Sequence, residues 1–375
     1  MKTLSLISAL TLAACFAAGC KIEPPLYLRT QVQSVVAVEA EVNVDLMWQV
    51  DWETQWAYDW NTEVMGTEGY EEPTAMSLHI YPQDDQGGHL SHTVKNFVGN
   101  RTDIPFVTGV YDLLFHNIDS EVLLFRDEED GSDDIHCYTR VISSGLKEST
   151  TVQTLQQKMA ETKASSIAPE NEPVINMPDG LFCLFDAGHV ISDNLDDYEY
   201  IDGKNVILIK GEMTPATYIH LVQVNLVNNN GRIISSGGAV LTGLADGVNL
   251  RTRIGGTQTV SVPTEAYIDE ENDMVGMRFQ SFGIPGCNPY SQESVDASVS
   301  EHCLVLNVIY ADTSYKNICV DITEQFRALP LGGVIILDLD VNDFPPGGGD
   351  EGGLSGFDAL ISDWDEITAG ATITY

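Results

Sequence analysis

Hydrophobic and polar residues alternate strictly in the segment "VNVDLMWQVDW", which begins at Val42. A period of two residues is typical of a β-strand that has one face in a core and the other in solvent. The alternation begins further upstream, so we predict one long strand from Val35 to Trp52. Trp48 and Trp52 fall on the apolar side of this strand, and we expect both rings to lie in a sheet core.

Short segments of the same kind follow along the chain, separated by turn-rich pieces such as "QDDQGG". They include "AMSLHIYP", "GVYDLLFHN", "TYIHLVQVNLV", "CLVLNVIYA" and "GGVIILDLDV". Many short strands at near-regular spacing predict an all-β fold of antiparallel β-sandwiches, and not βαβ units. The exception is the segment from Thr151 to Thr162, where Val152, Leu155 and Met159 share one helical face, so we predict a short helix there.

The predicted strands form two runs, and a polar, acidic region that ends in "SDNLDDYEYIDGKN" lies between them. We place a domain boundary near Gly203, with one sandwich domain in residues 31–202 and a second in residues 203–375. The predicted helix is then an insertion in the first domain. A chain of 375 residues is long enough to build two such cores.

The N-terminus has the pattern of an export signal, because the apolar run "LSLISALTLAA" is too short to span a bilayer. It leads into "AAGC", which ends at Cys20 and resembles the lipobox of bacterial lipoproteins. A second match, "LAAC" ending at Cys15, would leave an apolar mature end, so we favour Cys20. We predict a signal peptide in residues 1–19 and a tether in residues 20–30 that is anchored through the acylated Cys20.

The net charge of the chain excludes two classes of binding partner. The formal net charge of −38 repels nucleic acid and anionic membrane surfaces, so neither is an expected partner.

No CxxC pair occurs, so zinc and thioredoxin-type sites are not indicated. Export allows disulfides, and two of the last three cysteines could pair. The odd count leaves at least one thiol, which we expect to be buried as a small apolar residue. The five cysteines after the lipobox are Cys137, Cys183, Cys287, Cys303 and Cys319.

Two motifs that suggest a cofactor or a metal have simpler interpretations. "GGGDEG", residues 347–352, satisfies GxGxxG, but it follows two prolines and carries acids that would repel phosphate, so we predict a flexible loop. "HLSH" places His89 and His92 three residues apart, after His79. On a strand this spacing points the two side chains to opposite faces. We therefore expect exposed loop and strand histidines and no metal site.

The stretch "RDEEDGSDD", Arg126 to Asp134, is rich in oxygen ligands of the calcium type. If Gly131 is aligned to the glycine of an EF-hand loop, however, Arg126 falls at the first ligand position and Cys137 at the last. A charged hairpin tip between two strands is the better interpretation, with weak calcium binding as the alternative. No GxSxG elbow, Cys/His pair or paired carboxylates stand out. We predict no catalytic residues, no cofactor and no enzyme activity.

Trp56, Tyr58 and Trp60 lie beyond the strict alternation, in the polar segment "ETQWAYDWNTE". Two interpretations are open for these rings. They either cover an end of the sandwich core or form an exposed platform on which a glycan stacks. Solvent exposure would distinguish the two.

The start "CKIEPPLYLR", the strand "VNVDLMWQVDW", and "PTAMSLHIYP" followed by "GVYDLLFHNIDSEVLLFRD" resemble a family of uncharacterised Bacteroidetes lipoproteins. That family is related to the fimbrillins, the subunits of surface fimbriae. In the second half, "AVLTGLADGVNLRT", "KNICVDITEQF", "LPLGGVIILDLDV" and the ending "GGLSGFDALISDWDEITAGATITY" resemble the C-terminal fimbrillin module. The resemblance implies two transthyretin-like β-sandwich domains, no catalysis, and a lipid-anchored position on the outer membrane at the cell surface.

The resemblance also implies association with other fimbrial subunits by β-strand addition, in which a neighbour's strand fills a groove opened by proteolysis. Processing in the family follows a basic residue, and the only one between Lys21 and Lys95 is Arg29. Cleavage there would free only about ten residues, few for a strand that opens a whole groove. We therefore expect an accessory or anchor subunit that keeps its lipid, with the final "ATITY" as a contact strand. A surface lipoprotein that binds glycan through Trp56, Tyr58 and Trp60 is the alternative.

Overall fold

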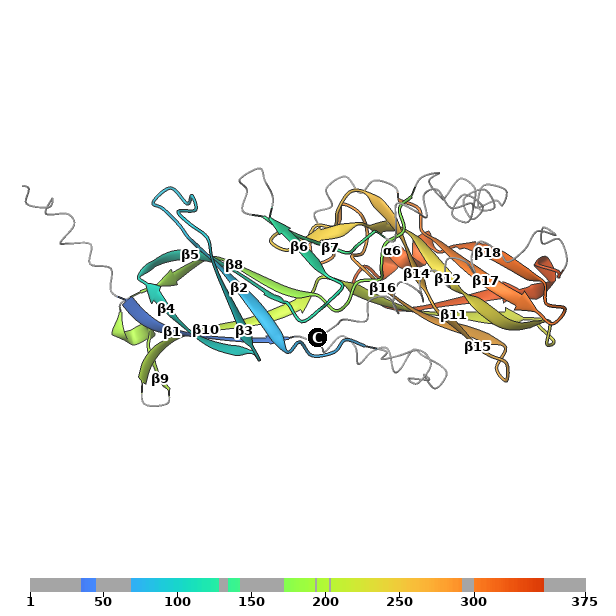
Figure 1. Cartoon of the computed structure of the whole chain (residues 1–375), viewed down its shortest axis with the longest axis horizontal. Helices are drawn as coiled ribbons and strands as arrows, with labels where there is room; N and C mark the ends of the chain where they lie inside the picture. Colours follow the sequence, from blue (N-terminus) through green and yellow to red (C-terminus); the bar gives the residue numbers. More distant parts are fainter. Residues whose placement is uncertain are drawn as a thin grey trace, which may run out of the picture.

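The computed structural model describes residues 35–44, 69–127, 134–141, 172–192, 194–201, 204–291 and 300–346. Strands dominate these residues, which confirms the predicted all-β class. They form two β-sandwiches toward opposite ends of an elongated molecule, and a small sheet lies between them (Figure 1). Among the described residues, no helix is long and apolar enough to cross a membrane.

The N-terminal sandwich is built from one long strand path, β3-β2-β5-β8-β10-β1-β4, with β9 paired to β10. The path folds over on itself, because only Gly99 and Asn100 join β3 and β4 at its two ends. Its strands are β1 (Val35–Val44), β2 (Ala75–Pro82), β3 (Thr93–Val98), β4 (Arg101–Val107), β5 (Gly109–Asn117), β8 (Phe182–Ile191), β9 (Glu199–Ile201) and β10 (Lys204–Pro215), with a 3-10 turn, η3 (Leu195–Asp197), before β9.

Strand alternation fills the core of this sandwich. Val36, Val38, Ala40 and Val42 of β1 are all buried, as the period of two residues predicted. They pack with Met76, Leu78, Leu113, Phe115, Ile207 and Ile209 from other strands. The predicted strand continues to Trp52, but residues 45–68, with Trp48 and Trp52, lie outside the described residues.

Two sheets form the C-terminal sandwich, in the orders β15-β16-β11-β19 and β14-β12-β17-β18. Leu241, Val262, Phe279, Leu306 and Leu337 are among the side chains packed between them. The strands are β11 (Tyr218–Val227), β12 (Ile233–Ala245), β14 (Thr259–Thr264), β15 (Ala266–Asp269), β16 (Met274–Ser281), β17 (Cys303–Tyr310), β18 (Tyr315–Asp321) and β19 (Gly333–Asp340).

The two sides of the C-terminal sandwich differ. On one side the chain passes directly from β14 into β15 through Glu265, so a continuous segment bridges the two sheets. On the other side the sheets end in β18 and β19. The helix α6 (Thr323–Ala328) connects these two strands, and the 3-10 turn η4 (Val341–Asp343) follows β19.

Strand direction departs from the prediction of antiparallel pairing in two places. β1 pairs in parallel with β10, and β11 pairs in parallel with β19. In both cases the partners are far apart in the sequence, so no hairpin turn sets their relative direction. Alternation of side chains is the same in parallel and antiparallel strands, so the sequence pattern could not reveal this.

The small sheet, β13-β7-β6, lies between the two sandwiches. It contains β6 (Leu124–Asp127), β7 (Ile135–Tyr138) and β13 (Gly247–Asn249). β6 and β7 pair antiparallel on either side of the acidic stretch, which agrees with the predicted hairpin. The loop after β13 carries Arg253, which donates through Nη1 to the carbonyl oxygens of Thr214 at 3.3 Å and Pro215 at 3.2 Å, and through Nη2 to that of Cys183. This side chain therefore links the C-terminal sandwich to β8 and β10.

The predicted domain boundary near residue 203 falls just before β10. Because β10 pairs with β1, β8 and β9, the chain leaves the N-terminal sandwich only after Pro215. The division into the ranges 31–202 and 203–375 stays a prediction. The helix predicted in residues 151–162 lies outside the described residues, and α6 belongs to the second sandwich.

Candidate functional site

Several of the residues and motifs that the sequence singled out lie outside the part of the chain that the structure describes. This holds for Cys20 and Arg29, for Trp56, Tyr58 and Trp60, for "GGGDEG" and for the C-terminal "ATITY". Lipid attachment, processing and ring stacking therefore stay predictions. The described residues offer a different candidate, which is the side of the C-terminal sandwich bounded by β18 and β19. We call it the open edge.

β19 forms one border of the open edge. It pairs with β11 alone among the described strands, so its other side is the outer edge of the sheet. Ile335, Leu337 and Leu339 are buried, whereas Ile336 is 47% exposed and Asp338 is also exposed. From Ile335 onward, the strand has one face in the core and a solvent face that carries an apolar side chain, whereas Val334 at its start is buried.

Two consecutive glycines let β19 start close to its neighbour. Gly332 has φ +93°, and a Cβ there would lie 2.3 Å from the carbonyl oxygen of Ile219. Gly333 has φ +146°. Only glycine adopts such backbone angles without strain, so the pair "GG" sets the turn from α6 into β19.

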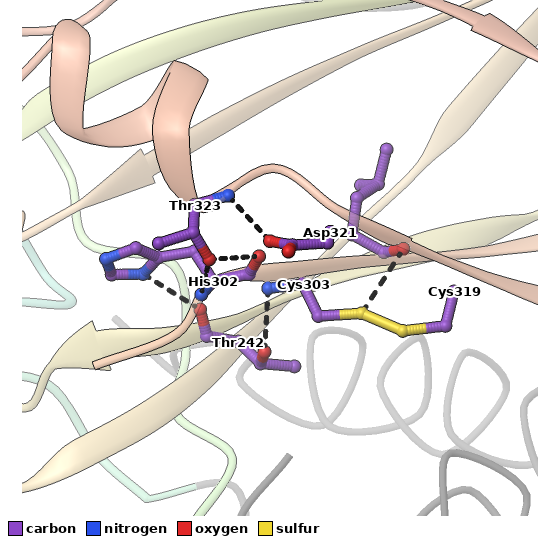
Figure 2. The surroundings of a disulfide bond; sticks show 7 residues. Thr242, His302, Cys303, Cys319, Asp321 and Thr323 are labelled. Atoms are coloured by element: carbon purple, nitrogen blue, oxygen red, sulfur yellow. Dashed lines mark hydrogen bonds between the residues drawn. A yellow bond between two sulfur atoms is a disulfide. The ribbon is translucent and has the colours of Figure 1, made fainter. Parts of the chain in front are cut away.

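β18 forms the other border, and a disulfide holds it to β17. Cys303 on β17 and Cys319 on β18 are bonded, and Figure 2 shows this link beside the start of β17. The backbone N–H of Cys303 donates to Thr242 Oγ1 at 3.2 Å, which fixes β17 to β12 as well. The disulfide confirms that two of the last three cysteines pair. Cys137 and Cys183 are free and buried, as expected for an unpaired thiol, and Cys287 is half-buried.

The helix between β18 and β19 is anchored by one aromatic side chain. Phe326 is fully buried, and its ring lies 4.3 Å from that of His220 and 4.5 Å from that of His302. Burial lowers the pKa of both histidines to about 4, so both imidazoles are neutral at pH 7. His220 Nε2 is 2.9 Å from the carbonyl oxygen of Leu329, so in this neutral ring Nε2 carries the proton and donates.

The exposed edge of a β-sheet can form backbone hydrogen bonds with another strand. Its N–H and C=O groups can pair with a strand of another chain, and side chains on alternate positions then give specificity. The disulfide and α6 hold the two borders of the open edge in place. The sequence could not single out these strands, because alternation does not show which strand lies at the end of a sheet.

A second candidate is a hydrogen-bonded chain on the N-terminal sandwich that contains three of the eight histidines. His79 Nδ1 lies 2.8 Å from His92 Nε2, and His79 Nε2 lies 3.0 Å from His116 Nε2. The prediction of exposed histidines is wrong for His79, which is only 8% exposed. The rings of His92 and His116 lie 5.0 Å and 5.1 Å from its ring, so side chains from other segments cover a residue whose burial the local pattern could not reveal.

Hydrogen-bond polarity fixes the tautomers in this chain of histidines. His116 Nδ1 donates to the carbonyl oxygen of Asn117 at 2.9 Å, so Nε2 of this neutral ring must accept. His79 then donates through Nε2 and accepts through Nδ1 from His92. Burial, together with His116 and His92, lowers the pKa of His79 to about 3, and burial lowers that of His116 to about 4.

Next to the histidines, Asp112 joins the two sandwiches. Its side chain is 4% exposed and accepts from His89 Nε2 at 2.9 Å, from the backbone N–H of Gly188 at 2.8 Å and from Arg251 Nη2 at 3.4 Å. Burial alone would raise the pKa of this carboxyl, but the hydrogen bonds from His89 and Gly188 and the charge of Arg251 hold it below its usual value. Among the described residues, no group of three or more His, Cys, Asp or Glu is arranged to hold a metal ion.

Several solved structures are similar to this one. A proposed adhesin from Bacteroides ovatus is 14% identical, with a TM-score of 0.48, and the alignment covers 82% of this chain and 93% of the other. The fimbrial anchor protein Mfa2 from Porphyromonas gingivalis is 10% identical, with a TM-score of 0.39 over 81% and 91% of the two chains. The tip fimbrial protein Mfa3 of the same organism, in a C-terminally truncated form, is 7% identical, with a TM-score of 0.33 over 76% and 82%.

Sequence comparison identifies a protein family whose description names no activity. No curated protein matches this chain. The model of a family described as "Domain of unknown function (DUF5119)" matches residues 50–265, which is more than half of the chain. The match begins before β2 and ends at the passage from β14 into β15. The chain belongs to the DUF5119 family.

Proposed function

We propose that this protein is a cell-surface lipoprotein of fimbrillin type, a structural and adhesive subunit that associates with other subunits by β-strand addition. The open edge carries this proposal. On one side of the C-terminal sandwich the single residue Glu265 joins β14 to β15, whereas on the other side a longer segment that contains α6 joins β18 to β19. A strand from a neighbouring subunit would pair at that edge, and Ile336 would contact its side chains.

The accessory or anchor role follows from two predictions of the sequence. Cys20 stands where a lipobox cysteine is acylated, and cleavage at Arg29 would leave β1 in its sheet. We therefore propose that the protein stays attached to the outer membrane by lipid. Expressed in a Bacteroidetes host, a Cys20→Ala variant should move to the soluble fraction, and a Cys15→Ala variant should remain with the membrane. The reverse result would assign the lipid to Cys15.

Site-specific photo-crosslinking tests strand addition. A photoreactive phenylalanine analogue replaces Ile336 on β19 in one variant and Tyr267 on β15 in a matched control, in a host that assembles fimbriae. Both positions are exposed, at 47% and 36%, and they lie on the open and the bridged side of the same sheet. We expect the Ile336 variant to crosslink to a strand segment of another fimbrial subunit, identified by peptide mass spectrometry. Equal crosslinking at both positions, or none at Ile336 in assembled fimbriae, would overturn the proposal.

A further inference from the structure

The open edge has room for one added strand. β19 is 8 residues long and pairs with β11 alone among the described strands, so its outer backbone groups face no described neighbour. At about 3.3 Å per residue, a segment of similar length could pair along about 26 Å of this border. The side chains on the two sides of β19 then decide which segment fits.

The inner side of the open edge favours apolar side chains. Val320 on β18, Leu329 after α6 and Phe344 after η4 belong to the segments that border this edge, and all three pack against the core of the C-terminal sandwich. Each is only half-buried, so part of its apolar surface is still in contact with solvent. An added strand directs alternate side chains toward this side, and apolar ones would remove that surface from water.

The outer side of β19 has a different chemistry. Ile336 is 47% exposed, and Asp338, two residues further along, is also exposed. Asp338 Oδ1 accepts from Asn225 Nδ2 on β11 at 2.8 Å. This amide is neutral, so it holds the carboxylate in place without balancing its charge. Lys316, on the opposite border, lies over the ring of Phe344 instead, with Nζ 5.8 Å from the centroid. The outer side of β19 therefore presents one apolar and one negatively charged side chain.

These two side chains select the partner strand. On one face of a sheet, side chains opposite each other on adjacent strands have Cβ atoms about 5 Å apart, where opposite charges attract and like charges repel. A residue beside Asp338 is therefore favoured if it is basic, and one beside Ile336 if it is apolar. A second copy of this chain is a poor donor, because each copy carries a formal net charge of −38. We propose that the open edge takes a strand of a different subunit, with apolar residues on its inner side and a lysine or arginine beside Asp338 on its outer side.

This inference rests on the strand addition proposed above and adds the chemistry of the partner. Three fluorescein-labelled peptides of nine residues test it, with valine at every odd position and threonine at the outer even positions. The two central even positions are lysine in one peptide, serine in the second and glutamate in the third. Binding to the full mature chain is measured by fluorescence anisotropy. We expect the lysine peptide to bind about fivefold or more tightly than the glutamate peptide at low salt, with a smaller difference in about 0.5 M NaCl.

Matched variants locate the effect at Asp338, since a chain of net charge −38 attracts any basic peptide. Asp338→Asn removes one charge and keeps an oxygen that can accept from Asn225, and Asp103→Asn removes one exposed charge from β4. We expect the preference for the lysine peptide to fall about threefold in Asp338→Asn and to remain in Asp103→Asn, with melting temperatures unchanged. No peptide binding, equal binding of the lysine and glutamate peptides, or the same fall in both variants would overturn this inference.

Crosslinking at Ile336 separates this inference from the proposal on which it rests. A crosslink to a strand that lacks a basic residue, or to a second copy of this chain, would leave strand addition intact and remove only the partner chemistry. The absence of any crosslink at Ile336 in assembled fimbriae would remove both.

Discussion

Gly243 allows β12 to approach a neighbouring backbone segment closely in the C-terminal sandwich. Gly243 lies in the irregular part of β12, where the register with β14 shifts between Leu241 and Leu244. Its φ is +77°, and a Cβ there would lie 2.2 Å from the carbonyl oxygen of Glu301. The backbone N–H of Gly243 also donates to Glu172 Oε1 at 2.7 Å. A residue without a side chain is therefore required for both the turn and the contact.

Gly243→Ala should destabilise the protein strongly. Positive φ alone costs about 1–2 kcal/mol for a residue with a Cβ, and the contact with Glu301 forces β12 to move as well. We expect the free energy of unfolding to fall by about 3 kcal/mol or more in urea denaturation. Gly231→Ala is the matched control, because Gly231 has φ +72° with nothing within 4 Å of its Cβ position. Equal losses in the two variants would show that the close contact contributes nothing.

The local sequence of a strand predicts its burial pattern but not its pairing partner or direction. Alternation of apolar and polar residues marks β1 as a strand and shows which of its side chains are buried, because each residue's own type carries that information. Partner and direction do not follow from it. The parallel pairing of β11 with β19, and the place of β19 at the end of a sheet, depend on contacts between residues more than one hundred positions apart. The open edge could therefore not be predicted.

The burial of the histidines could not be predicted from the local sequence either. A single histidine in an apolar strand does not reveal whether another ring will cover it. His79 and His116 bond within one face of the N-terminal sandwich, and His220 and His302 lie on Phe326 in the other sandwich. All four are neutral because burial penalises the imidazolium ion.

These four histidines should make the fold sensitive to acid. Their pKa values are about 3 for His79 and about 4 for His116, His220 and His302, against about 6.5 in an unfolded chain. Below pH 6.5 the unfolded chain takes up protons that the folded protein excludes. Stability is therefore complete above pH 6.5 and is lost as the pH falls toward 4. Each histidine removes up to about 1.4 kcal/mol per pH unit.

Two carboxyls act in the opposite direction, because burial raises the pKa of both Glu172 and Asp246. Burial raises the pKa of Glu172 from 4.5 to about 7, so its contribution is complete below pH 4.5 and is lost as the pH rises toward 7. Between pH 6.5 and 4.5, the four histidines outweigh these two carboxyls. Urea denaturation at pH 7, 6 and 5 should show falling stability, with a smaller slope in His79→Gln. A stability that rises on acidification would contradict the prediction.

At the scale of the whole molecule, the two sandwiches are joined by more than a peptide link. β10 continues into β11 after only Ala216 and Thr217, and the loop after β13 returns to the N-terminal sandwich. Arg251 reaches Asp112, and Arg253 reaches the carbonyl oxygens at the ends of β8 and β10. For the anchored subunit proposed above, such a joint would keep the two sandwiches from turning independently, as a flexible link would let them do.

Arg253→Met should loosen this joint. Methionine fills much of the same space but donates no hydrogen bond, so the carbonyl oxygens of Thr214, Pro215 and Cys183 lose a charged partner. Hydrogen bonds to charged groups contribute about 1.5–3 kcal/mol, so we expect the melting temperature to fall by several degrees. Limited proteolysis should also cleave faster near Ala216, where the chain passes between the sandwiches.

Arg327→Met is the matched control, because Arg327 donates to the carbonyl oxygen of Ser300 within the C-terminal sandwich. It should lower the melting temperature without faster cleavage near Ala216, and equal cleavage in both variants would show that Arg253 does not hold the joint.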